Sequence, residues 1–284
     1  MTLHSINGAL LAAHEIGEDV KGTIMTVHGG RGSGTHAADF RAYAPLADAG
    51  FRIVSYDQRG HGDSSQTLPL TYEQLADDLE ELRRELVGKP AIILGGSFGG
   101  YIALTHALKY PDSCSHLILR ATAPSWHHEI TAIANVREAT RYLPDADPDY
   151  WERMFAGQIE SEEEMRRNSL AIAPLAEGRL YRAGKQGGKN MIRIDTAREL
   201  FRVGHEYDVR DRLATLTPPT LILAGTDDWT CTVDNSYFMV EHIPNATLLA
   251  VAGAPHAVHV DSAKLVLRAI TDFVSDHPSG GHAA

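Results

Sequence analysis

A serine in the first half of the chain lies in a sequence context suited to covalent acyl transfer. Gly95, Ser97 and Gly99 form a Gly-x-Ser-x-Gly motif, preceded by the apolar run 91–94 and followed by residues 101–108, which have the composition of a helix. A strand, a sharp turn and a helix in this order expose a serine hydroxyl at the turn. The turn strains the backbone, so the flanking residues must be small. We therefore interpret Ser97 as a nucleophile rather than as part of an incidental glycine-rich loop.

A serine hydroxyl is a poor nucleophile at neutral pH, so it needs a histidine base and a carboxylate that orients the base. Asp228 and His256 each follow a predicted strand, at residues 220–224 and 246–251. The loops after parallel strands meet at one edge of a sheet. We therefore expect Asp228 and His256 to converge on Ser97.

Each of these two residues has a close neighbour of the same type. Asp228 is preferred over the adjacent Asp227 because it lies three residues after Gly225. His256 is preferred over His259 because it directly follows a glycine turn. Asp227 remains an alternative acid, and His259 remains an alternative base or a residue of the pocket or core.

Acyl transfer also needs donors for the oxygen that becomes negatively charged. The predicted strand 23–27 runs into His28-Gly29-Gly30, a position where backbone N–H groups stabilise such an oxyanion. We expect the N–H groups of Gly30 and Phe98 to form this oxyanion hole.

The alternation of strands and helices predicts the domain organisation. Four strand–helix alternations before Pro124 indicate a doubly wound, mostly parallel α/β sheet. The pattern breaks over residues 125–206, which are expected to form an inserted helical cap, and it then resumes. The predicted core is therefore 1–124 with 207–276, and the tail 277–284 is expected to be disordered.

Composition limits the classes of partner. The 284 residues are 43% hydrophobic and 22% charged, with a net charge of −11 and no Lys/Arg-rich run, which argues against a nucleic-acid partner. No apolar stretch is long enough to cross a membrane. Two cysteines and no recognisable targeting segment favour the cytoplasm. No histidine pair has metal-binding spacing, so we expect a small-molecule substrate, no metal and no cofactor.

Several of these motifs occur together in one known family. His28-Gly29-Gly30, Asp57-Gln58-Arg59-Gly60 and Gly95-Gly96-Ser97-Phe98-Gly99, followed by Asp228 and His256, resemble the motifs of the proline iminopeptidase group of α/β-hydrolases. The resemblance covers nearly the whole predicted sheet domain. It implies the α/β-hydrolase fold with a helical cap.

The resemblance also implies roles for individual residues. It assigns Ser97 as nucleophile, Asp228 as acid and His256 as base. It assigns the N–H groups of Gly30 and Phe98 to the oxyanion hole.

The chain departs from this group at positions that bear on specificity. Arg31 replaces the proline of the usual His-Gly-Gly-Pro-Gly motif. Trp229 occupies a position, directly after the acid, where some relatives place a glutamate that holds a substrate ammonium group. Glu152 is a candidate for a cap glutamate with that role.

The combined pattern predicts a serine hydrolase that cleaves a carboxylic ester, a lactone or an amide of a small apolar substrate. Esters and lactones come first because Trp229 and the aromatic residues of the predicted cap favour an apolar, ring-shaped acyl or leaving group. The alternative is an aminopeptidase of the proline iminopeptidase type. Three further hypotheses are compatible with the same residues: a non-catalytic ligand receptor, a cofactor-free lyase and a C–C hydrolase. The candidate substrate-binding residues are Trp126, Trp151, Glu152, Trp229 and His259.

Overall fold

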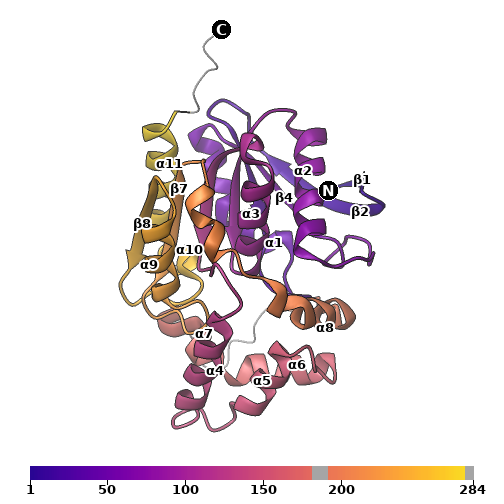
Figure 1. The fold of residues 1–284 in the computed structure, drawn as a ribbon, viewed down its shortest axis with the longest axis vertical. Helices are drawn as coiled ribbons and strands as arrows, with labels where there is room; N and C mark the ends of the chain where they lie inside the picture. Colours follow the sequence, from indigo (N-terminus) through magenta and orange to yellow (C-terminus); the bar gives the residue numbers. More distant parts are fainter. Residues whose placement is uncertain (181–190, 279–284) are drawn as a thin grey trace.

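An eight-stranded sheet forms the centre of the computed structural model, which describes residues 1–180 and 191–278 (Figure 1). The strand order is β1-β2-β4-β3-β5-β6-β7-β8. Strands β3 to β8 are parallel, while β2 pairs antiparallel with both β1 and β4. The strands are β1 (Thr2–Ile6), β2 (Ala9–Ile16), β3 (Thr23–Val27), β4 (Arg52–Tyr56), β5 (Ala91–Gly96), β6 (Cys114–Arg120), β7 (Thr220–Gly225) and β8 (Ala246–Val251).

Helices cover both faces of the sheet because the central strands are apolar on both sides. In β5, Ile93 packs into a core with residues of α2, α3 and α9, whereas Ile92 and Leu94 pack with residues of α1 and α11. A parallel sheet buried on both faces matches the predicted doubly wound architecture. The covering helices are α1 (His36–Tyr43), α2 (Tyr72–Leu86), α3 (Phe98–Lys109), α9 (Val233–His242), α10 (Val258–Asp261) and α11 (Ala263–Asp276).

A helical insertion separates β6 from β7 in the chain, as predicted, and Figure 1 shows its helices α4, α5 and α6 beyond one end of the sheet. Asp147 and Ser161 cap two of these helices by accepting hydrogen bonds from Asp149 and Glu164 N–H groups. The inserted helices are α4 (His128–Ala139), α5 (Pro148–Phe155), α6 (Glu162–Ala171), α7 (Ala173–Glu177) and α8 (Ile194–Arg202). In the described ranges, no helix is long and apolar enough to cross a membrane.

The predicted tail begins inside the described part of the chain. The carbonyl of His277 lies 2.6 Å from His116 Nε2, within hydrogen-bonding distance. Residues 279–284 lie outside the described residues. The bounds of core, cap and tail remain predictions.

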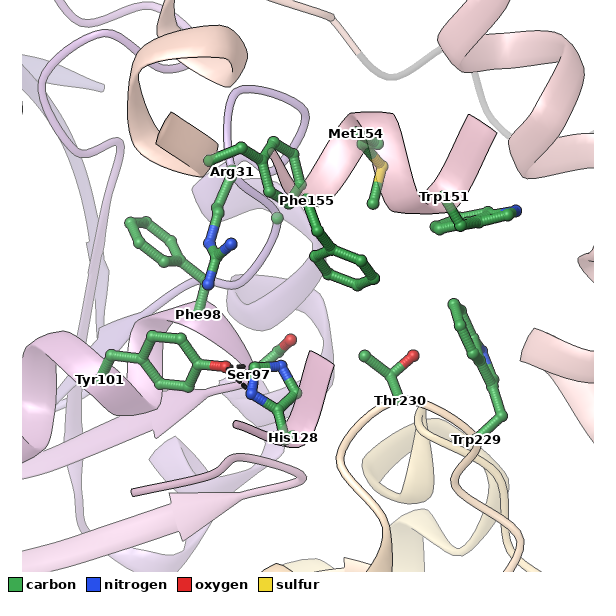
Figure 2. Close-up of a pocket in the computed structure, with 12 residues that line it drawn as sticks. Arg31, Ser97, Phe98, Tyr101, His128, Trp151, Met154, Phe155, Trp229 and Thr230 are labelled. Carbon is green, nitrogen blue, oxygen red and sulfur yellow. Dashed lines mark hydrogen bonds between the residues drawn. The ribbon is translucent and has the colours of Figure 1, made fainter. Parts of the chain in front are cut away.

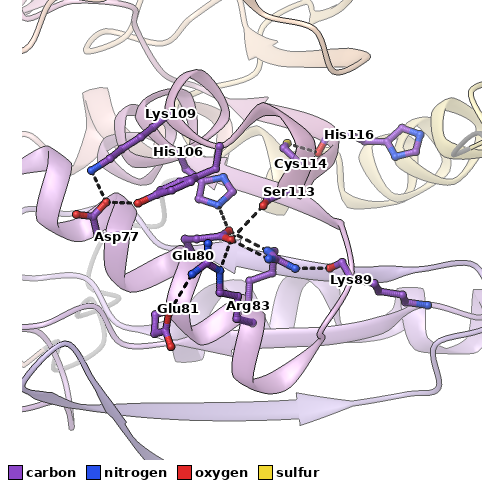
Figure 3. Close-up of polar contacts among 12 residues, drawn as sticks. Asp77, Glu80, Glu81, Arg83, Lys89, His106, Lys109, Ser113, Cys114 and His116 are labelled. Atoms are coloured by element: carbon purple, nitrogen blue, oxygen red, sulfur yellow. Dashed lines mark hydrogen bonds and ion pairs between the residues drawn. The ribbon is translucent and has the colours of Figure 1, made fainter. Parts of the chain in front are cut away.

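A buried carboxylate joins α2 to α3, the helix that begins directly after the predicted nucleophile (Figure 3). Glu80 is 2% exposed and accepts hydrogen bonds from Arg83 (2.8 and 2.9 Å) and from Ser113 Oγ (3.0 Å), and it pairs with His106 Nε2 at 3.0 Å. Burial by itself raises the pKa of Glu80, but the contacts with Arg83 and His106 outweigh it and lower that pKa below its ordinary value. The ionised carboxylate therefore fixes α3 relative to α2.

We expect Glu80→Gln to lower the free energy of unfolding at pH 7 by about 3 kcal/mol or more, because it leaves Arg83 buried without its counter-charge. The folded-state pKa of Glu80 lies below its unfolded value of about 4.3. Its stabilisation is therefore full above that value and is lost as the pH falls further. Urea unfolding at pH 7 and pH 3.5 should show the gap between wild type and variant narrowing in acid.

Glu81→Gln is the matched control, because the neighbouring Glu81 side chain is 48% exposed and exposed ion pairs contribute little. If the difference in free energy of unfolding between wild type and Glu80→Gln were equal at the two pH values, it would contradict the role of the ionised Glu80 carboxylate.

Candidate active site

Ser97 lies at the sharp turn between β5 and α3. Its φ is 52° and its ψ is −124°. Residues with a side chain seldom adopt a positive φ. The Ser97 N–H donates to the Arg120 carbonyl at 2.8 Å, and the Ser97 carbonyl accepts from Thr122 Oγ1 at 2.8 Å. The end of β6 therefore holds the strained turn from both sides.

Two glycines allow the neighbouring segments to approach this turn. A Cβ atom on Gly99 would lie 1.9 Å from the Val27 carbonyl oxygen, where β3 ends. A Cβ atom on Gly29 would lie 2.9 Å from the Ser97 Cβ. Neither contact leaves room for a side chain, so the His28–Gly30 loop lies directly against the serine.

Two backbone N–H groups close to Ser97 have no hydrogen-bond partner in the described part of the chain. Phe98 is the first residue of α3, so its N–H has no acceptor within the helix. The Gly30 N–H donates to no group among the described residues. Both residues line the cavity that contains Ser97. This arrangement can stabilise an oxygen that becomes negatively charged.

Asp228 and His256, which are far apart in the sequence, lie in contact. Asp228 Oδ2 is 2.7 Å from His256 Nδ1. Its other oxygen accepts from the N–H groups of Thr230 (2.9 Å) and Cys231 (3.0 Å). The Asp228 side chain has no exposed surface, whereas that of His256 is 25% exposed. The carboxylate thus holds Nδ1 protonated and leaves Nε2 as the free ring nitrogen.

The adjacent carboxylate lies outside this arrangement. Asp227 is exposed and accepts a hydrogen bond from Thr226 Oγ1 at 3.1 Å. Within the described residues, Ser97 Oγ and His256 are not joined by a hydrogen bond. Such bonds often tighten only when a substrate binds.

An aromatic cavity of about 130 Å³ opens beside Ser97 (Figure 2). An apolar cavity of about 150 Å³ can hold a molecule the size of benzene, so this space is sized for one small ring. Trp151 of α5 and Trp229 of the loop after β7 meet edge to face, with ring centroids 5.1 Å apart. The aromatic lining residues are Phe98, Tyr101, Trp151, Phe155, Phe201 and Trp229.

Four residues line the cavity without having been predicted as pocket residues: Met154, Phe155, Phe201 and Thr230. For two of them a signal was present. Met154 and Phe155 follow Trp151 by three and four residues, which places all three side chains on one face of α5.

Arg31 introduces a charge into this aromatic lining. Its Nη1 donates to Glu129 Oε1 at 2.7 Å, and the two side chains are only 4% and 2% exposed. The guanidinium carbon lies 4.8 Å from the Phe201 ring centroid and 5.5 Å from that of Tyr101. The ion pair joins the loop after β3 to the first turn of α4 in the insertion. It was missed because nothing near Glu129 in the sequence marks a partner 98 residues away.

Tyr101 and His128 add two uncharged polar side chains to the lining, which also includes Ser97 and Thr230. His128 Nδ1 lies 3.0 Å from the Ser125 carbonyl oxygen, and its Nε2 lies 2.9 Å from the Tyr101 hydroxyl. Burial lowers the pKa of His128 to about 3. This imidazole is therefore neutral at physiological pH.

Three predicted substrate-binding residues lie away from the cavity. Glu152 is 57% exposed and forms an ion pair with Arg137 at 2.7 Å on the surface of the insertion. Trp126 is half-buried and stacks on the neighbouring His127 ring. Periodicity could not determine that Glu152 lies on the exposed face of α5, and Trp126 lies in the turn before α4.

His259 lies in α10, is buried and does not line the cavity. Its ring stacks on Tyr43, with centroids 5.9 Å apart, and burial with Arg120 nearby lowers its pKa to about 2. His259 is thus a neutral residue of the core and not of the pocket. In the described ranges, no three His, Cys, Asp or Glu side chains are grouped to hold a metal ion.

We expect Ser97→Gly to raise the free energy of unfolding by about 1 kcal/mol. The strain at a residue held in such a conformation is about 1–3 kcal/mol, which exceeds the extra chain entropy that glycine loses on folding, about 0.5–1 kcal/mol. Ser97→Ala is the matched control because it removes the hydroxyl but retains the Cβ. Urea unfolding of the two variants tests the strain, and equal stability would contradict it.

Comparison with known proteins places this geometry in a family. The sequence pattern of the alpha/beta hydrolase fold matches residues 22–263. Over 270 residues, 93% of this chain and 96% of the other, the chain is 40% identical to a Pestalotiopsis fici protein named proline iminopeptidase PfmaB. It is 27% identical over 272 residues, 88% of this chain and 89% of the other, to a proline iminopeptidase from Lactobacillus delbrueckii subsp. lactis.

A solved structure of lower sequence identity shows the same fold. An esterase from Exiguobacterium antarcticum superposes with a TM-score of 0.69 at 20% identity, over 96% of this chain and 99% of the esterase. At that identity the likeness shows the fold alone. The chain therefore belongs to the α/β-hydrolase fold family, in its proline iminopeptidase-like group, and is a hydrolase.

Proposed function

We propose that this hydrolase cleaves an amide or ester of a small, ring-sized acyl group through an acyl-Ser97 intermediate. The observation that carries the proposal is the 2.7 Å contact between Asp228 Oδ2 and His256 Nδ1, at the sheet edge where Ser97 leaves β5. In this proposal residues 125–206 form the cap, and residues 1–124 with 207–276 form the core.

In the first half-reaction, Ser97 Oγ attacks the substrate carbonyl carbon while His256 Nε2 takes the hydroxyl proton. Asp228 stabilises the imidazolium that results and keeps the ring oriented. The Gly30 and Phe98 N–H groups donate to the tetrahedral oxyanion. His256 then protonates the leaving group, which departs as an amine or alcohol and leaves the acyl-enzyme.

In the second half-reaction, His256 removes a proton from water as the water attacks the acyl carbonyl. The same N–H groups stabilise the second tetrahedral intermediate. Its collapse returns the proton to Ser97 Oγ and releases the carboxylic acid. The net reaction adds one water across the scissile bond and restores the enzyme.

The relatives support an order of substrate classes different from the one that the sequence alone favoured. The protein that is 40% identical to this chain is named a proline iminopeptidase, which supports the amide of an N-terminal imino acid ahead of esters and lactones. The cavity size supports the same ring. Trp151 and Trp229 would pack against it.

The pocket lining supports a second candidate, an ester or lactone without an ammonium group. Arg31 is the only residue with a formal charge among the described residues that line the cavity. Glu152, the sequence-based candidate for binding an ammonium group, is exposed and paired with Arg137. Neither observation favours a positively charged acyl group.

A paired turnover assay tests the function. Short esters and simple lactones form one arm, and the anilides of free-amino and N-blocked proline form the other, each with Ser97→Ala as control. We expect hydrolysis in at least one arm that Ser97→Ala reduces by about 10³-fold or more. No Ser97-dependent turnover in either arm would contradict the proposal and favour a ligand receptor.

The assignment of the acid has its own test. Asp228→Asn should lower kcat by about 10³–10⁴-fold because it no longer holds the tautomer with Nδ1 protonated. Asp227→Asn, at the exposed neighbour, should change kcat less than threefold. The substrate from the first assay and steady-state kinetics measure both, and the reverse order would reassign the acid to Asp227.

A further inference from the structure

The acyl cavity has a cation built into its lining. Arg31 is 5% exposed and lines the cavity together with Ser97. Its guanidinium packs among the rings of Phe98, Tyr101 and Phe201, at 4.8 to 5.9 Å from their centroids. In Figure 2 the guanidinium extends between aromatic side chains into the space that the lining residues surround. The aromatic contacts and the ion pair fix its position.

The guanidinium has unused donor capacity. A guanidinium carries five N–H donors and no acceptor. Within the described residues, only Nη1 has a hydrogen-bond partner, Glu129 Oε1, and the other two nitrogens are not sealed from solvent. Because Arg31 lines the cavity, these nitrogens can donate to a group bound there.

The charge of Arg31 is already balanced. Glu129 contacts Arg31 at 2.7 Å and is 2% exposed, and His205 Nε2 lies 3.5 Å from its other oxygen. Glu129 is not among the residues that line the cavity. A group bound in the cavity therefore contacts Arg31 N–H donors whose positive charge is already balanced by Glu129. Among the described residues that line the cavity there is no carboxylate to pair with an ammonium group, and an acidic group would add an uncompensated negative charge.

We propose that Arg31 makes the pocket selective for uncharged acyl groups that carry a hydrogen-bond acceptor, such as a carbonyl oxygen on a five-membered ring. The proposal rests on acyl transfer at Ser97 and names the substrate class of that site. The ring size is that of proline, as in the relatives. The preference for an uncharged hydrogen-bond acceptor on this ring comes from Arg31, which replaces the proline of the usual His-Gly-Gly-Pro-Gly motif.

Three anilides with the same leaving group test this selectivity. Their acyl groups are 5-oxoprolyl, which has a ring carbonyl; cyclopentanecarbonyl, which has none; and prolyl, which is cationic near pH 7. We expect kcat/KM to follow that order, with the 5-oxoprolyl compound exceeding the cyclopentanecarbonyl compound by about tenfold or more, the effect of one hydrogen bond to a charged group.

Variants at the ion pair show whether Arg31 is responsible. Arg31→Met alone leaves Glu129 buried without its counter-charge and can lose the fold. The Arg31→Met, Glu129→Gln double variant avoids this, and thermal unfolding confirms that it is folded. In the double variant the 5-oxoprolyl to cyclopentanecarbonyl ratio should fall to within about threefold of one. Arg137→Met, at an exposed arginine of the same cap helix as Glu129, should retain the wild-type ratio.

The outcomes separate the two proposals. Ser97-dependent hydrolysis with the prolyl compound preferred, or a 5-oxoprolyl preference that survives in the folded double variant, would overturn the role of Arg31 and leave acyl transfer intact. No Ser97-dependent hydrolysis of these anilides or of the esters and lactones above would overturn acyl transfer itself.

Discussion

The backbone conformation of Ser97 is the constraint on which the site depends. A positive φ at a residue with a side chain persists only where the surroundings over-determine it. Here the Arg120 carbonyl and the Thr122 hydroxyl hold the turn, and Gly99 lets it press against the Val27 carbonyl. The same closeness brings the Gly29–Gly30 loop beside the serine. One strained residue therefore fixes the relative positions of β3, β5, β6 and α3.

The cavity beside Ser97 is assembled from two parts of the molecule that have separate cores. Phe98 and Tyr101 belong to the core under α2 and α3, whereas Trp151, Phe155 and Phe201 belong to an aromatic cluster of the insertion. Trp229, from the loop after β7, packs with the second group. Because each part supplies some of the walls, neither part alone defines the shape of the cavity.

The fold and the hydrogen-bonded Asp228–His256 pair could be predicted because they depend on local patterns. Strand periodicity, the glycines around Ser97 and the position of each residue after a strand are all visible in the sequence. Glu152 and Arg31 show where prediction failed. Glu152 was selected by residue type on a helix whose buried face was unknown, and it is exposed. The partner of Arg31 lies 98 residues away, and only the packing of the insertion onto the core brings them together.

The buried ion pair between Arg31 and Glu129 also limits how this pocket can diverge over evolution. Each residue neutralises the other at a place where the two side chains are only 4% and 2% exposed. Replacing Arg31 by the proline usual at this position leaves the Glu129 carboxylate buried without its counter-charge. Replacing Glu129 first leaves the Arg31 guanidinium in the same state. Both single steps are destabilising, although the doubly substituted protein need not be. Because each single step is destabilising, we expect substitutions at the two positions to occur together.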